Sequence, residues 1–298
     1  MFNRCTLTLA ASLMATTSAY GATTAQNATA AAAAVAVNQD DLEPDRPDVT
    51  NGTHIVDTGL LQVEIGGLYM HAGARQHALG TPVTARVGLF EWLEARVGTD
   101  GLLTQTDGSS SVGGIGNIQL GAKLRLWADP GGVPVLSILP AVNVPTASAA
   151  KGLGSGTADY TLALLTGTDI GRHAHVDVNY GIGRIGAGDS EPRFVQHLVS
   201  VSASDAISDN WNPYVEAFWF SRQEVDGVAV TAVDAGAIYE LGARYALDGG
   251  VQIGVSRNAP PFAAFGGISI IVGDILGGHG VHARQRQAQK RAAARPRR

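Results

Sequence analysis

The 298-residue chain is poor in cysteine, in charge and in long apolar runs. Its one cysteine, Cys5, lies in an N-terminal apolar stretch, so the rest of the chain can form no disulfide bond. No run of 18 or more apolar residues follows the first two dozen residues, which excludes a transmembrane helix there. Charged residues make up 16% and aromatic residues 6%, whereas glycine fills 38 positions. This composition is unusual for a soluble enzyme, and the length allows one large all-β domain or two smaller domains.

The beginning of the chain predicts export. Arg4 provides the positive charge of a signal peptide, and "TLTLAASLMATTSA" provides its apolar stretch. Small residues at Ala19-Tyr20-Gly21 suit a cleavage site. We therefore expect a signal peptide over residues 1–21 and a disordered Ala-rich linker over residues 22–44.

The end of the chain is basic. Residues 282–298 carry seven Lys or Arg residues and no acid. No aromatic residue separates the basic ones and no nucleic-acid-binding motif is present, so we expect no nucleic-acid partner. Residues 274–298 are predicted to be a basic disordered tail.

Between these ends, apolar and polar residues alternate in about twelve segments. In "NIQLGAKLRLW" (117–127), one face carries Ile, Leu and Ala, and the other carries Gln, Gly, Lys and Arg. Segments of this kind match strands that cross a membrane at a tilt, ~9–11 residues each. The predicted strands are 60–70, 82–90, 93–98, 117–127, 133–144, 158–169, 174–182, 193–203, 212–220, 231–240, 249–256 and 265–273.

The connections between these segments alternate in length. Links such as "TDGLLTQTDGSSSVGGIG" and "PTASAAKGLGSGT" follow odd-numbered strands, and links such as "EW" and "IGRH" follow even-numbered strands. Short periplasmic turns and long outer loops are typical of outer-membrane barrels. The sequence therefore predicts an all-β fold: one antiparallel up-and-down transmembrane β-barrel of about 12 strands over residues 45–273.

The polar face of these strands is predicted to line the barrel lumen, and the apolar face to meet lipid. Few aromatic residues are available for the core of a soluble sandwich, which favours the barrel. The charged residues on the polar face are Glu64, Arg86, Glu94, Arg96, Lys123, Arg125, Asp177 and Glu216. They could form a charged constriction that orients a permeating anion or aromatic acid, or an internal salt-bridge network that stiffens the barrel.

The tryptophans lie at predicted strand ends. Trp92, Trp127 and Trp211 are expected at the periplasmic rim, and Trp219 near the opposite rim. Indole rings gather at membrane interfaces, so we expect these four residues to form interfacial belts.

No motif indicates catalysis, a cofactor or a metal. "GGIG" (113–116) precedes a strand rather than a helix, so it does not predict a phosphate loop. His173, His175 and Asp177 share one strand face, but a polar lumen face explains them better than a metal site. No nucleophile signature brings Ser, His and Asp together, so we predict that the protein is not an enzyme.

One motif lies ahead of the first strand: Asp45, Arg46, Pro47, Asp48 and Thr50 in "DRPDVT". The stretch "EPDRPDVTNGTHIVDTGLLQVEIGGLYM" resembles the start of a family of outer-membrane transporters named for the meta pathway of phenol degradation. "PVTARVGLFEWLEARVG", "GIGNIQLGAKLRLW", "LPAVNVPTAS" and "APPFAAFGGISIIVG" are similar to later parts of that family, so the resemblance spans Asp45 to Gly273. One difference is that 25 residues follow the last predicted strand, where such barrels usually end on an aromatic residue.

The resemblance implies an outer-membrane barrel that moves small compounds, aromatic ones among them, with no catalytic residues. Its partners would be outer-membrane lipid and a small solute. Asp45, Arg46 and Asp48 are hypothesised to cap, plug or dock on the periplasmic mouth through ion pairs. The alternatives are a sealed structural or surface-interaction barrel without transport, and a soluble secreted β-protein.

Overall fold

The computed structural model describes residues 42–47, 49–127, 134–171, 173–188 and 192–277. The predicted signal peptide, nearly all of the predicted linker, Asp48 and the tail after Gly277 lie outside the described residues. Within the described ranges, no helix is long and apolar enough to cross a membrane.

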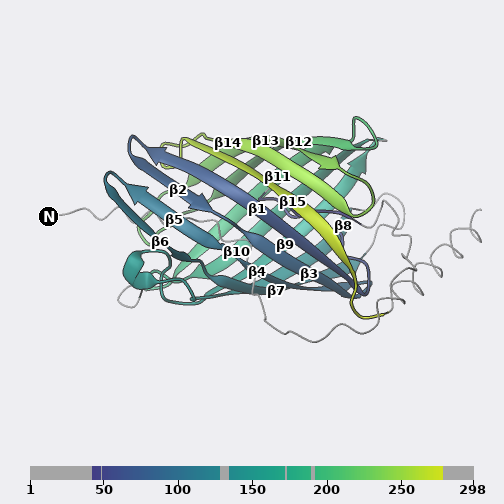
Figure 1. Ribbon diagram of the computed structural model, residues 1–298, viewed down its shortest axis with the longest axis horizontal. Helices are drawn as coiled ribbons and strands as arrows, with labels where there is room; N and C mark the ends of the chain where they lie inside the picture. The colour runs from purple at the N-terminus through teal and green to yellow at the C-terminus, as the bar shows by residue number, and fades with distance from the viewer. Residues whose placement is uncertain (1–41, 48, 128–133, 172, 189–191, 278–298) are drawn as a thin grey trace, which may run out of the picture.

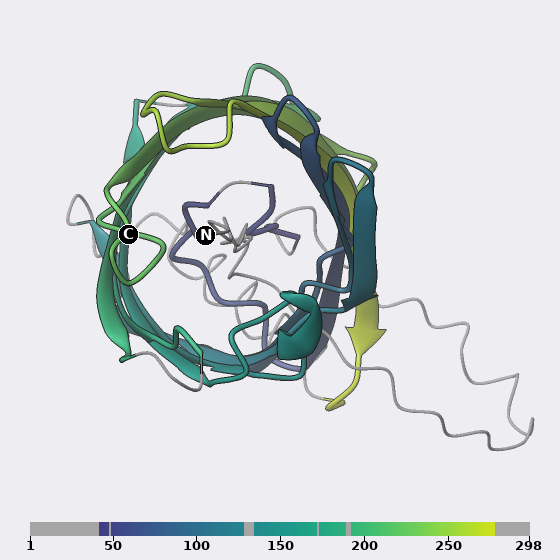
Figure 2. The same cartoon turned by 90° about the vertical axis from the view of Figure 1, so that its left-hand side faces the viewer.

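The described chain forms one closed antiparallel barrel (Figures 1 and 2). Twelve strands surround the lumen, each paired with its neighbour, and β15 pairs with β1 to close the ring. Three further strands lengthen the wall at one end. The strands are β1 (Leu60–Gly73), β2 (Gln76–Gly80), β3 (Val83–Phe90), β4 (Leu93–Thr99), β5 (Leu102–Asp107), β6 (Ser110–Ile115), β7 (Ile118–Trp127), β8 (Val135–Val144), β9 (Asp159–Ile170), β10 (Ala174–Ile185), β11 (Phe194–Asp205), β12 (Trp211–Phe220), β13 (Val230–Glu240), β14 (Tyr245–Gly254) and β15 (Phe262–Asp274). The predicted fold class is confirmed.

Two predicted long loops are partly strands, which corrects our expectation. "HAGARQHALG" contains the end of β1 and all of β2, and "TDGLLTQTDGSSSVGGIG" contains β5 and β6. Pro82, which has no N–H group, separates β2 from β3, and Gly101, with a φ of 67°, separates β4 from β5. Polar and Gly-rich composition suggested loops, but each segment continues the pairing of the wall beneath it.

The two ends of the barrel therefore differ. At the short-turn end, brief connections such as Glu91-Trp92 join the strands, and at the extended end lie β2, β5, β6 and the longer connections. The single helical element among the described residues, η2 (Ala149–Lys151), lies in the connection from β8 to β9.

The apolar face of the strands points outward and the polar face inward. On β7, Leu120 is 49% exposed, whereas Lys123 is fully buried. The same arrangement, with apolar side chains outside and polar ones inside, recurs around the wall: the outward side chains of Leu162, Val199 and Val251 are also exposed. A soluble sandwich would bury these side chains, so this arrangement indicates a barrel whose outer surface faces lipid.

The described residues 42–47 and 49–59 lie inside the barrel rather than beside it. Figure 2, viewed from the extended end, shows this purple segment inside the ring of strands. Leu42 and Val56 pack with Leu60, Ala246 and Ile271 near the short-turn end. Both ends of the described segment therefore lie at that end of the barrel, and its packed part includes Leu42, within the stretch that we expected to be linker. We call residues 42–59 the lumen segment.

Candidate functional site: the lumen and its N-terminal segment

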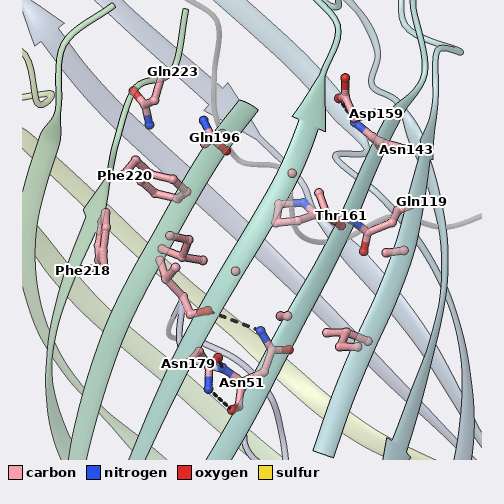
Figure 3. A pocket seen from close by; sticks show the side chains of 18 of the residues that line it. Asn51, Gln119, Asn143, Asp159, Thr161, Asn179, Gln196, Phe218, Phe220 and Gln223 are labelled. Carbon is pink, nitrogen blue, oxygen red and sulfur yellow. Dashed lines mark hydrogen bonds between the residues drawn. The ribbon is translucent and has the colours of Figure 1, made fainter. Parts of the chain in front are cut away.

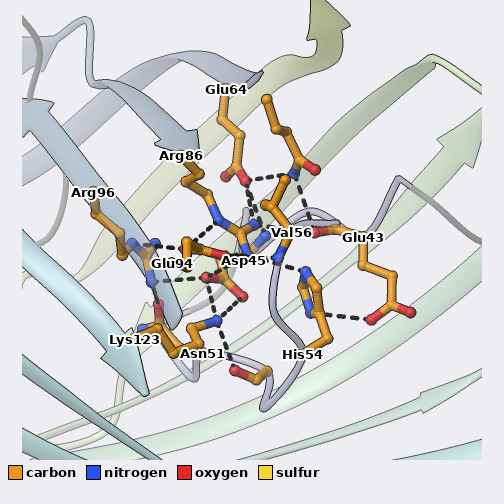
Figure 4. A network of polar contacts seen from close by, with 12 residues as sticks. Glu43, Asp45, Asn51, His54, Val56, Glu64, Arg86, Glu94, Arg96 and Lys123 are labelled. Atoms are coloured by element: carbon orange, nitrogen blue, oxygen red, sulfur yellow. Dashed lines mark hydrogen bonds and ion pairs between the residues drawn. The ribbon is translucent and has the colours of Figure 1, made fainter. Parts of the chain in front are cut away.

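A buried ion network holds the lumen segment at Asp45 (Figure 4). We call Asp45 and Arg46 the base of the segment. Arg86 on β3 donates from Nη1 to Glu64 Oε1 at 2.7 Å and from Nε to Glu94 Oε1 at 2.9 Å. All three side chains are fully buried. Because neighbouring strands β1, β3 and β4 supply them on one inward face, strand pairing alone brings them together.

Asp45 of the lumen segment completes this network. Its carboxylate is 2.7 Å from Lys123 Nζ, 2.8 Å from Arg96 Nη1 and 3.4 Å from Arg86 Nη2. Burial alone would raise the pKa of Asp45, but Arg86, Lys123 and Arg96 hold that pKa well below its ordinary value. The wall supplies three cations and two carboxylates, so the Asp45 charge brings the network to neutrality.

Arg46 points to a different part of the wall. Its Nη2 is 3.2 Å from Asp248 Oδ1 on β14 and donates to the Gly266 carbonyl oxygen at 3.3 Å. The guanidinium lies against Gly66 and Gly267, which pair across the β1–β15 seam. A Cβ atom at Gly66 would overlap the guanidinium, and one at Gly267 would lie 2.8 Å from Nε. Glycine at these two positions therefore makes room for Arg46.

The tip of the lumen segment, residues 49–53, is held mainly by hydrogen bonds. The backbone N–H groups of Val49 and Thr50 donate to the Glu216 carboxylate, and the Thr50 hydroxyl contacts both Glu216 and Ser200. Asn51 exchanges two hydrogen bonds with Asn179, at 2.7 and 3.0 Å. Base and tip together tie the segment to strands on opposite sides of the lumen.

The predicted lumen-facing residues fall into three groups. Glu64, Arg86, Glu94, Arg96 and Lys123 form the base network, and Glu216 holds the tip. The other two lie apart: Arg125 interacts electrostatically with Glu43, and Asp177 contacts His175. His175 also contacts Asp169, at 2.7 Å, so carboxylates occupy both of its ring nitrogens. His173 is exposed and makes no contact with this group in the part of the chain that is described.

Several contact residues had no sequence signal. Asp248 falls between the predicted strands 231–240 and 249–256, and Asn51 lies just outside the motif that we singled out. Asn179, Ser137 and Ser200 are ordinary polar residues on inward strand faces. Only their depth in the lumen, set by the path of residues 42–59, distinguishes them from the other inward polar residues.

The four tryptophans all point outward and are partly exposed. Trp92, Trp127 and Trp211 lie at the short-turn end, whereas Trp219 lies toward the extended end on β12. Trp92 stacks on Phe90 with ring centroids 5.6 Å apart, and Trp211 packs on Tyr239 at 4.9 Å. A role at the membrane interface remains a proposal for these residues.

A cavity of about 240 Å³ lies between the tip and the extended end (Figure 3). Phe218, Phe220, Phe265 and Leu198 give it an apolar wall. Among its other lining residues, amide and hydroxyl side chains come from Asn51, Gln119, Asn143, Thr161, Asn179, Gln196, Gln223 and Gln252. Its charged lining residues are Arg46, which is paired with Asp248, and the acids Asp159 and Asp234.

Comparison with known proteins places the chain in a family. The family model described as "Putative MetA-pathway of phenol degradation" matches residues 44–270. The chain belongs to this family. The match begins just before Asp45 and includes the lumen segment, as the sequence resemblance predicts.

Several solved structures share the fold of this chain. An outer-membrane channel from Pseudomonas putida F1 has a TM-score of 0.60 and 13% identity, over 77% of this chain and 99% of that one. The NanC porin has a TM-score of 0.50 and 11% identity, over 70% of this chain and 100% of that one. At such identities the likeness establishes the fold, which is that of outer-membrane channels. No curated protein matches the chain.

Proposed function

We propose that the protein is an outer-membrane channel for small uncharged compounds, aromatic ones among them. The short-turn end would face the periplasm and the extended end the exterior. The observation that carries the proposal is the lining of the cavity: one aromatic wall, many amide groups and, among the described lining residues, no Lys or Arg other than Arg46, which is paired with Asp248.

The charge balance supports an uncharged solute over an anion. The wall cations Arg86, Arg96 and Lys123 are neutralised by Glu64, Glu94 and Asp45. Nearer the exterior, the cavity presents carboxylates at Asp159 and Asp234. An anion would therefore lose its hydration shell without gaining a positive partner. Of the two interpretations of the wall charges, this favours the internal salt-bridge network.

Passage also requires a path around the lumen segment. The tip lies under the cavity, and its own contacting groups are uncharged backbone, amide and hydroxyl groups. No ion pair has to break when they leave Glu216, Arg96 and Lys123, so we propose that residues 49–53 move aside while the base stays docked. Undocking the base would leave several buried charges without partners, which costs far more than exchanging hydrogen bonds with water.

The test is planar-bilayer conductance of refolded protein that lacks residues 1–21, followed by liposome swelling with two solutes. Phenyl glucoside and phenyl glucuronide share ring and size and differ in one carboxylate. We expect discrete current steps, and faster swelling with the glucoside than with the glucuronide. Equal or inverted swelling rates would contradict the uncharged-solute class.

The dense buried network also fits a sealed barrel without transport, the second candidate. Insertion into liposomes without conductance and without swelling for either solute would establish that candidate instead. Failure to insert would reject the membrane placement altogether.

A further inference from the structure

One cation of the barrel wall points the opposite way from all the others. The described strands contain five Lys or Arg side chains: Arg86, Arg96, Lys123, Arg125 and Arg184. The first four face the lumen. On β10, Asn179 points inward to Asn51, so alternation places Gly181, Gly183 and Ile185 inside and Arg184 outside. Arg184 is accordingly exposed, on the same outer face as Ile182.

Arg184 sits at the border of the apolar outer surface. It is the penultimate residue of β10, at the extended end, and its cross-strand neighbours are Tyr160 on β9 and Val195 on β11. One step toward the middle of the wall, Leu162 and Ile182 form an apolar outward pair and are 46% and 41% exposed. An outward Arg is costly at the membrane midplane and tolerated near the interface, where it can extend toward headgroups.

A second guanidinium adjoins the first. The Arg193 guanidinium lies 5.5 Å from the centroid of the Tyr160 ring and donates to the Ala158 carbonyl oxygen. Tyr160 is 52% exposed on the outer face, and it is the cross-strand neighbour of Arg184 as well as the ring partner of Arg193. Among the described residues, no carboxylate pairs with Arg184 or Arg193; Asp189 and Glu191 of the same connection lie outside the described residues. We call Tyr160, Arg184 and Arg193 the outer-rim patch.

We infer that the outer-rim patch binds the phosphate group of a phosphorylated glycolipid of the lipid A class in the outer leaflet. Arginine suits this ligand because its planar fork binds phosphate oxygens bidentately, and the Tyr160 hydroxyl adds a donor. The apolar side chains of Leu162 and Ile182 directly below, and of Val195 beside Arg184, would contact the acyl chains. This combination favours a lipid over free phosphate. The inference rests on membrane placement and is independent of transport.

The first test uses the wild-type protein in detergent and measures lipid binding by native mass spectrometry. The probes are bis-phosphorylated lipid A, dephosphorylated lipid A and inorganic phosphate as a competitor. We expect binding of the phosphorylated form, at least tenfold weaker binding of the dephosphorylated form, and no competition by phosphate. Equal binding of both lipids would overturn the inference, and so would displacement by inorganic phosphate.

The second test uses variants. Arg184→Gln and Arg193→Gln should each weaken lipid A binding about fivefold, and the double variant about 25-fold, as expected for one arginine near an anionic surface. Arg257→Gln is the matched control, because Arg257 is an exposed arginine at the same end, in the connection from β14 to β15. Heat-modifiable migration on gels verifies folding. A double variant that is folded and binds lipid A like wild type would overturn the assignment to these residues.

Lipid binding and conductance separate this inference from the proposed function. A barrel that binds lipid A and does not conduct would keep the outer-rim patch and reject transport. A conducting barrel without selective lipid A binding would do the reverse.

Discussion

The lumen segment contacts the barrel in two regions that differ in chemistry. At its base, Asp45 and Arg46 enter ion pairs with Lys123, Arg96, Arg86 and Asp248. At its tip, Val49 to Thr53 contribute backbone, amide and hydroxyl groups rather than charges. Their charged partners in the described contacts are Glu216, Arg96, which donates to Asn51 Oδ1, and Lys123, which donates to the Gly52 carbonyl oxygen. This difference underlies our proposal that the base stays fixed while the tip moves.

Burial makes the difference between the two regions large. Separating a buried charge from its partner costs about 3–5 kcal/mol, whereas a hydrogen bond contributes about 0.5–1.5 kcal/mol when neutral and about 1.5–3 kcal/mol when one partner is charged, as with Glu216. When the tip moves, Glu216 opens toward the cavity, where water can take the place of the lost donors. When the base moves, Arg86, Arg96 and Lys123 retain only two carboxylates. We therefore expect base variants to unfold the barrel and tip variants to alter its opening.

The largest effect is expected for Arg86→Met. The change leaves Glu64, Glu94 and Asp45 buried beside a smaller positive charge, and it should lower the free energy of unfolding by about 3–5 kcal/mol. Urea unfolding in detergent micelles, followed by tryptophan fluorescence, measures it. Arg257→Met, at an exposed position, is the control and should change stability by less than about 0.5 kcal/mol.

Asp45→Asn should have the next largest effect. It keeps the shape of the side chain but removes the charge that neutralises Lys123 and Arg96. We therefore expect the free energy of unfolding to fall by about 2–4 kcal/mol and the conductance of the barrel to rise. Asp209→Asn, in the exposed turn before β12, controls for the chemistry of the substitution. A stable Asp45→Asn protein with wild-type conductance would show that the base does not anchor the segment.

Arg46 and Gly66 can be tested as a pair. Arg46→Ala leaves Asp248 without its partner and should cost about 1–3 kcal/mol, with altered conductance. Gly66→Ala should be similarly damaging, because its methyl group overlaps the guanidinium. In the Arg46→Ala background the overlap is gone, so the second change should be nearly neutral. Additive losses in the double variant would contradict the contact.

Low pH should weaken the ion pairs that Asp45 makes at the base of the lumen segment. The pKa of Asp45 is held well below its ordinary value of 3.8, so this carboxylate contributes stability that is present above about pH 4 and is lost as pH falls further. The free energy of unfolding should fall between pH 7 and pH 2, and this fall should be smaller in Asp45→Asn. A wild-type curve parallel to the Asp45→Asn curve would contradict the assignment.

The smallest effect is expected at the tip. Thr50→Val keeps the shape and removes the hydroxyl contacts with Glu216 and Ser200. We expect the docked position of the tip to lose about 1 kcal/mol of stabilisation, which corresponds to a roughly fivefold rise in open probability. The free energy of unfolding of the barrel should change little. Single-channel recordings measure the open probability, and Thr50→Ser, which keeps the hydroxyl, should restore the wild-type value.

The sequence predicted the barrel because the signal is local. Alternation over "NIQLGAKLRLW" determines which way Lys123 and Leu120 point, and similar alternation marks the other predicted strands. The hairpin β5–β6 was missed because Ser and Gly in "DGSSSVGG" are typical of loops, and only pairing with β2 makes the segment a strand.

The site was predicted only in part, for a different reason. Inward charges such as Arg86 and Glu94 follow from alternation, but their partner Asp45 reaches them through a segment without regular structure. Asp248 was missed because its contact with Arg46 spans 202 positions in the chain. Contacts of this kind depend on the closed ring and on the path of the lumen segment, and no local pattern encodes either.

The most direct test of the central claim is conductance with the tip locked to the wall. The Thr50 Oγ1 and Ser200 Oγ atoms are 2.9 Å apart, so cysteines at both positions place their sulfur atoms within reach of a disulfide. The chain after residue 21 has no other cysteine. We predict that the oxidised Thr50→Cys/Ser200→Cys protein loses its current steps and regains them on reduction. Equal conductance in both states, with the crosslink verified by mass spectrometry, would contradict a channel opened by movement of the tip.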